Sequence, residues 1–167
     1  MIPVNFLNIF SLLCFFLLPA ISNASSYGPF KLIEHAPVSE IWLNPGFLSY
    51  HFQKDIDLDD NNIGFGAEYR YSTIHSLTAG RFHNSDKQIS NYAAWYWQPL
   101  EYASIRIGAL IGAINGYPKA YEGGWFPLLL PVVSFEQNNL GINLTVVPSY
   151  KDMLHGSISL QLKLKVH

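Results

Sequence analysis

The sequence predicts an all-β protein, an eight-stranded antiparallel transmembrane β-barrel, and three observations favour this fold. Side chains alternate between apolar and polar over several stretches, and a period of two indicates a strand whose faces meet different surroundings. Hydrophobic residues make up 49% of the chain and aromatic residues 15%, whereas only 13% are charged. This composition is typical of barrels with aromatic girdles. After the N-terminal run no eighteen consecutive residues are apolar, so no transmembrane helix is expected there.

The first 24 residues have the pattern of an export signal. An apolar run at residues 6–18 is followed by Pro19 and by Ser22-Asn23-Ala24, a small-residue pattern that favours cleavage after Ala24. The alternative is an uncleaved membrane anchor, which Pro19 and the small residues disfavour. The single cysteine, Cys14, lies in this run, so the chain after it is expected to form neither a disulfide nor a thiolate metal site.

Residues 25–45 are expected to form an N-terminal segment with at most a short interfacial helix, because prolines interrupt it. The barrel then covers residues 46–167. Its first strand, residues 46–53, places Leu48, Tyr50 and Phe52 toward lipid and His51 in the lumen. Residues 54–62 contain four aspartates, but they lack the glycine and terminal glutamate of a calcium loop, so a solvated loop is favoured.

Three further strands follow at residues 63–72, 76–82 and 90–97. The second strand places Glu68 and Arg70 in the lumen. A polar loop, His83-Asn84-Ser85-Asp86-Lys87, separates the third strand from the fourth, which Pro99 is expected to end. Aromatic residues gather near the end of the fourth strand, as expected at a membrane interface.

The fifth and sixth strands give the lumen its expected character. Residues 103–114 place Gly108, Leu110 and Gly112 inward, and two glycines beside a leucine are expected to leave room inside. Residues 126–136 are apolar on both faces as far as Val133, which suits a lumen that holds a hydrocarbon chain. The last two strands, residues 140–147 and 156–167, alternate cleanly. Isoleucine, leucine and valine on one face of the closing strand oppose two lysines on the other, although a strand of a soluble sandwich would also alternate.

Pro131 and Pro148 lie within or at the end of the sixth and seventh strands. Proline has no N–H to donate to a ladder, so each removes a rung between neighbouring strands. Together they predict a weak seam through which a lipid can slide sideways into the lumen. The alternative is that the prolines only terminate strands, which Pro148 alone would favour.

These segments resemble the PagP family of outer-membrane palmitoyltransferases, which move palmitate from a glycerophospholipid to lipid A. Residues 129–134 and 146–148 are similar to that family's two proline segments, and residues 97–100 to a third segment. The resemblance implies that the proline seam is a lateral gate for the acyl donor. It also implies that a small residue sets the acyl chain length at the floor of the slot, and Ala93 or Ala94 lies in that region.

The resemblance further implies three catalytic positions. Tyr50-His51 is similar to the family's aromatic-histidine pair, and Phe82-His83-Asn84-Ser85 to the segment that ends in Asp-Ser. Asn84 replaces the aspartate, so a neutral amide stands where the family has a carboxylate, and Asp86 is a possible substitute. By itself, the chemistry is reasonable: His51 is a suitable base, Ser85 a nucleophile or oxyanion donor, and Asn84 an amide donor.

The location and partners follow from the same resemblance. We expect a monomer in the outer membrane of a Gram-negative bacterium, with a phospholipid donor and lipid A as the acceptor. Neither a cofactor nor a metal is expected, and the net charge of −2 gives no reason to propose nucleic acid. Two alternatives stay open. One is a lipid A deacylase of the PagL type, whose His-x-Ser-Asn motif is close to His83-Asn84-Ser85-Asp86, and the other is a small barrel without catalytic activity.

Overall fold

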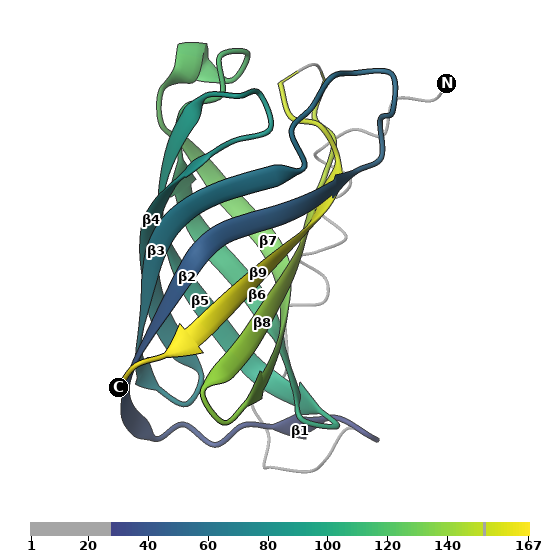
Figure 1. Ribbon diagram of the computed structural model, residues 1–167. Helices are drawn as coiled ribbons and strands as arrows, with labels where there is room; N and C mark the ends of the chain where they lie inside the picture. The colour runs from purple at the N-terminus through teal and green to yellow at the C-terminus, as the bar shows by residue number, and fades with distance from the viewer. Residues whose placement is uncertain (1–27, 152) are drawn as a thin grey trace.

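The computed structural model, which describes residues 28–151 and 153–167, is an eight-stranded antiparallel β-barrel (Figure 1). The predicted fold is confirmed, whereas the predicted export signal lies outside the described residues. Each strand pairs with the next along the chain, and the last pairs with the first and closes the barrel. The barrel strands are β2 (Pro37–His51), β3 (Asn61–Ser72), β4 (His75–His83), β5 (Ile89–Tyr102), β6 (Ile105–Ile114), β7 (Phe126–Gln137), β8 (Leu140–Val147) and β9 (Ser157–Lys165).

The alternation in the sequence corresponds to the outer and inner faces of this barrel. Large apolar side chains face outward. Aromatic residues lie among them, such as Phe65 and Tyr69 on β3. Polar and charged side chains, among them His51, Glu68 and Arg70, are buried inside. Among the described residues, no helix is long enough and apolar enough to cross a membrane.

The N-terminal part of the barrel differs from the prediction. Residues 28–36 contain no helix, and the short strand β1 (Lys31–Leu32) pairs instead with the end of β5. The first barrel strand begins at Pro37 rather than at residue 46, and it passes through Pro45. The pairing of β2 with β3 and with β9 changes register around that proline, and Gly46 has a φ of 106°. A bulge tolerates proline within a strand, and it explains why the sequence suggested a strand start there.

Strand β5 also continues past the proline that was expected to end it. The strand runs to Tyr102, and its register with β6 shifts between Trp97 and Leu100, at the position of Pro99. Here too a bulge in the strand accommodates a proline, Pro99, which has no backbone N–H to donate. The part of β5 beyond Pro99 pairs with β1 through Leu100 and Glu101.

The two ends of the barrel differ in their connections. Two-residue turns at residues 73–74, 103–104 and 138–139 join the strands at one end, which also carries β1 and the C-terminus (Figure 1). Longer loops lie at the other end, and the loop at residues 115–125 contains a short 3₁₀ helix, η1 (Tyr121–Gly123). We refer to these as the turn end and the loop end.

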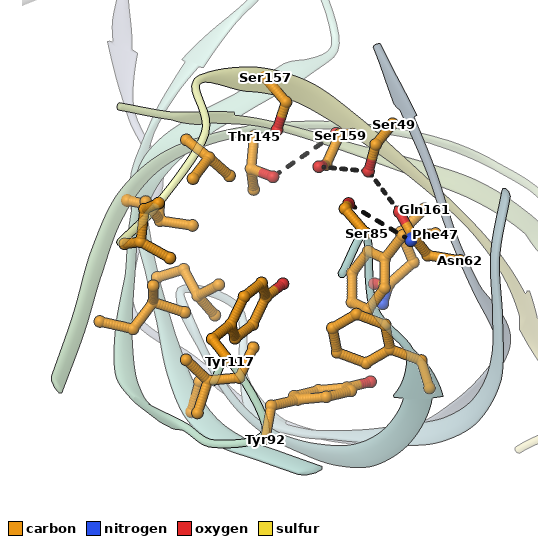
Figure 2. Close-up of a pocket in the computed structure, with 18 of the residues that line it drawn as sticks. Phe47, Ser49, Asn62, Ser85, Tyr92, Tyr117, Thr145, Ser157, Ser159 and Gln161 are labelled. Carbon is orange, nitrogen blue, oxygen red and sulfur yellow. Dashed lines mark hydrogen bonds between the residues drawn. The ribbon is translucent and has the colours of Figure 1, made fainter. Parts of the chain in front are cut away.

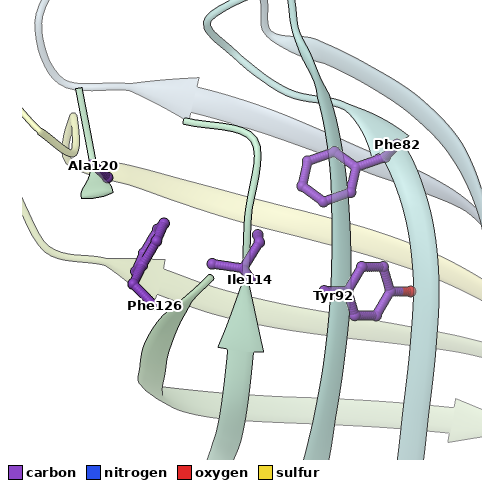
Figure 3. Packing of buried hydrophobic residues seen from close by; sticks show 5 residues of the cluster. All are labelled: Phe82, Tyr92, Ile114, Ala120 and Phe126. Atoms are coloured by element: carbon purple, nitrogen blue, oxygen red, sulfur yellow. The ribbon is translucent and has the colours of Figure 1, made fainter. Parts of the chain in front are cut away.

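Apolar side chains pack inside the loop end of the barrel. Phe82, Tyr92, Ile114 and Phe126 form a buried cluster with Ala120, which belongs to the loop before β7 (Figure 3). The loop at residues 115–125 therefore packs into the barrel and is part of its core.

Candidate functional site

An internal cavity lies under the loops and has two kinds of wall (Figure 2). Leucines and valine from β6, β7 and β8 form an apolar wall: Leu110, Leu128, Leu130 and Val147. Serine and threonine side chains from β2, β8 and β9 form a hydroxyl wall: Ser49, Thr145, Ser157 and Ser159. The cavity therefore suits an amphipathic ligand that has both an apolar chain and polar oxygens.

A hydrogen-bonded layer closes the cavity toward the turn end. Asn143 Nδ2 donates to Tyr96 Oη at 3.3 Å and to Gln161 Oε1 at 3.0 Å, and these three side chains line the cavity. Below them Ser134 Oγ donates to Asn143 Oδ1 at 2.7 Å and accepts from Gln98 Nε2 at 2.7 Å. These bonds join the five side chains into a floor for the cavity. Among the described residues, Gln161 Nε2 is buried there without a hydrogen-bond partner.

An ion network fills the lumen at the turn end. Glu68 is paired with Lys163 at 2.8 Å and with Arg70 at 3.4 Å, and all three side chains are at most 5% exposed. Glu136 binds both cations as well. Arg70, Lys163 and Lys165 also lie around the ring of Trp42, which is 1% exposed. The lumen at this level is occupied by paired charges and is not an open channel.

His51 lies at the end of β2 and lines the cavity at the loop end. Only 4% of the residue is exposed. Its Nδ1 lies 2.6 Å from Oδ1 of Asp60, a residue of the loop that follows β2. A carboxylate only accepts hydrogen bonds, so Nδ1 carries a proton, and in the neutral ring Nε2 keeps a lone pair. The pair therefore holds His51 in the tautomer that a general base needs.

Ser85 lines the same cavity from the loop between β4 and β5. Asn62 Nδ2 lies 3.5 Å from its Oγ and also donates to the His83 carbonyl at 3.1 Å (Figure 2). Asn62 in turn accepts from Ser49 Oγ at 2.6 Å. His51 and Ser85 are thus brought to one end of the barrel by loops that contact each other.

The side chain of Asn84, the third predicted catalytic residue, is used in hydrogen bonds that hold neighbouring loops together. It donates to Ser90 Oγ and to the Gly116 carbonyl, each at 2.8 Å, and accepts from the Gln88 N–H at 2.9 Å. The residue is completely buried and does not line the cavity. An aspartate here would place a carboxylate against the Gly116 carbonyl, so the amide matches this loop.

The ladder between β7 and β8 is incomplete at the loop end. Pairing runs from Val132 to Gln137 on β7, and among the described residues the part of β7 before Val132 has no register partner on β8. Pro131 is the first residue outside the ladder, and Pro148 follows the last residue of β8. Leu130 and Val147, which line the cavity, lie beside this opening in the ladder.

The comparisons with solved structures agree with the fold of a small eight-stranded β-barrel. The structure of the chain is similar to that of the de novo designed protein TMB2.3, with a TM-score of 0.55 and 12% identity, over 78% of this chain and 96% of the designed one. A second similar structure is the outer membrane protein Ail of Yersinia pestis, determined in a phospholipid bilayer nanodisc. It has a TM-score of 0.45 and 17% identity, over 76% of this chain and 98% of Ail. No family model and no curated protein matches the sequence.

The structure separates the predicted acyl-slot residues into two groups. Ala94 and Leu110 line the cavity, whereas Ala93 is exposed on the outer face. Gly108 and Gly112 lie outside the cavity lining. A Cβ at Gly108 would overlap the Trp97 carbonyl at the β5 bulge, and one at Gly112 would overlap Ala93 and Ala94. Both glycines therefore allow close approach of β5 and β6 and do not enlarge the slot.

Two other glycines make room for a large side chain inside the barrel, which strand alternation alone did not predict. Gly66 and Gly80 are paired across β3 and β4, and Gly80 is paired with Tyr92 on β5. A Cβ on either glycine would overlap Tyr92 Oη. The Tyr92 ring lies across these bare positions and lines the cavity, and the phenol oxygen comes within 3.4 Å of Asn44 Nδ2. A local signal of this packing is the pair Gly64 and Gly66, which alternate on the inner face of β3.

A second tyrosine closes the cavity from the loop at residues 115–125. Tyr117 lines the cavity (Figure 2). Its ring packs edge-on against Phe126. Burial raises the pKa of Tyr117 above its ordinary value, and the nearby charge of Asp86 acts in the same direction. The phenol is therefore neutral at any physiological pH and offers the cavity a hydrogen-bond donor.

Proposed function

We propose that the protein is an outer-membrane acyltransferase that moves an acyl chain from a phospholipid to lipid A. The observation that carries this proposal is the opening in the β7–β8 ladder beside an apolar wall, with His51 and Ser85 at the mouth of the same cavity. The opening offers an acyl chain a lateral path from the bilayer. The resemblance of the proline segments to the PagP family also supports acyl transfer as the function.

The transfer can be written with the residues at the mouth. A hydroxyl of lipid A attacks the ester carbonyl of the phospholipid while His51 Nε2 takes its proton. Ser85 Oγ donates to the developing oxyanion. The tetrahedral intermediate then releases the lysophospholipid, whose oxygen receives the proton from His51. Alternatively, Ser85 attacks first and carries the acyl group as an ester before lipid A accepts it.

Refolded protein in detergent, supplied with a phospholipid and lipid A, is expected to produce acylated lipid A and lysophospholipid in equal amounts. Mass spectrometry measures both products. Free fatty acid as the main product would instead indicate a hydrolase, and no product at all would indicate a barrel without this activity. The deacylase motif has less support, because His83 is exposed and lies outside the cavity lining.

Ala94→Met is expected to shorten the preferred acyl chain. Ala94 packs beside Tyr96 and Leu110 near the cavity floor, so a larger side chain fills the space that the chain end would occupy. Overpacking of this kind costs about 1–3 kcal/mol, which lowers binding of the longest chains first. Chain lengths on the modified lipid A are read by mass spectrometry. The matched control is Ala93→Met on the outer face, and an equal change in both variants would contradict the assignment.

A further inference from the structure

Residues 59–62, where the loop after β2 passes into the start of β3, contact both candidate catalytic residues. Asp60 accepts from His51 Nδ1 at 2.6 Å. The Asp59 N–H donates to the Ser85 carbonyl at 3.0 Å, and Asn62 Nδ2 lies 3.5 Å from Ser85 Oγ. One short segment thus sets the position of the base and of the serine together.

We infer that Asp60 is the positioning residue of His51, an inference that rests on the proposed acyl transfer. The acceptor of the His51 proton comes from the loop after β2, whereas the Asn84 position supplies none, since its amide is used by Ser90, Gln88 and Gly116. Asp86 also lines the cavity, but the bond at His51 Nδ1 is made by Asp60. The Asp60 side chain is 58% exposed and His51 only 5%, so the carboxylate stays hydrated while it orients a buried ring.

This arrangement defines what Asp60 does for the reaction. Its carboxylate fixes the proton on Nδ1, directs the Nε2 lone pair to the acceptor hydroxyl, and stabilises the imidazolium that forms after proton transfer. Asp60 touches neither lipid in this scheme and acts through His51. Its removal is therefore expected to lower kcat more than it raises KM.

Asp60→Ala is expected to lower kcat about 10- to 100-fold, with Asp60→Glu restoring part of the loss. The control is Asp55→Asn, an exposed aspartate of the same loop, which should keep wild-type kcat. An unchanged kcat in Asp60→Ala, or an equal loss in Asp55→Asn, would overturn the inference.

A second measurement does not depend on activity. Nitrogen NMR of the His51 ring in micelles, at a pH where the ring is neutral, should show Nδ1 protonated in the wild type and mainly Nε2 protonated in Asp60→Ala. The same tautomer in both proteins would overturn the positioning role. Wild-type protein that shows the Nδ1 tautomer but neither transfer nor release of acyl groups would instead refute the proposed function, and with it the catalytic use of the pair.

Discussion

His51→Ala is expected to reduce acyl transfer to lipid A by about 100-fold or more. The reason is that general acid–base help is typically worth about 100- to 10,000-fold, and His51 is the buried imidazole at the cavity mouth whose Nδ1 is already bound by Asp60. The measurement is acyl incorporation into lipid A by cells that express each variant at equal levels in the outer membrane. Ser85→Ala is expected to be severe as well, because its hydroxyl at the cavity mouth is the proposed oxyanion donor or nucleophile.

The matched control for His51 is His83→Ala. His83 is exposed on the outer side of β4 and does not line the cavity, so its removal should leave transfer unchanged. Full activity in His51→Ala would remove the catalytic role of this histidine. Release of free fatty acid by the wild type that is lost in His83→Ala would favour the deacylase alternative.

Glu68→Leu is expected to destabilise the barrel by about 3–5 kcal/mol, the usual cost of removing one partner from a buried ion pair. The network at the turn end contains three carboxylates, Glu40, Glu68 and Glu136, and three cations, Arg70, Lys163 and Lys165. Without Glu68, Lys163 keeps only Glu136 as a carboxylate partner among the described residues, while its side chain is 1% exposed. The midpoint of denaturant unfolding in lipid vesicles, read from the heat-modifiable gel mobility, measures the loss.

Lys165→Met serves as the control for this effect. Lys165 and its partner Glu40 are 28% and 25% exposed, so water screens their pairing, and the change should alter stability by less than about 1 kcal/mol. Equal unfolding midpoints for the wild type and Glu68→Leu would contradict the view that these charges stabilise the barrel as a network.

The closing strand and β3 illustrate how much of the fold was predictable. Their side chains alternate in parity, and this local pattern predicted that Leu162 faces outward and that Glu68 faces inward, as the structure has them. The first and fourth barrel strands were less predictable, because Pro45 and Pro99 look like strand ends in the sequence. Whether a proline ends a strand or lies in a bulge depends on the neighbouring strands, which supply or omit the missing hydrogen bond.

The candidate site was also only partly predictable from the sequence. The sequence by itself determined the barrel, the lumen position of His51 and the pair of prolines at the β7–β8 opening, because strand periodicity and the missing proline N–H are properties of single residues and their neighbours. Only the tertiary structure decided that Asp60 binds His51, that the Asn84 amide binds the Gly116 carbonyl of another loop, and that Tyr92 covers Gly66 and Gly80. These contacts join residues from different loops and strands. They depend on the register of each strand pair and on the path of each loop after the barrel has closed, and neither is encoded in local alternation.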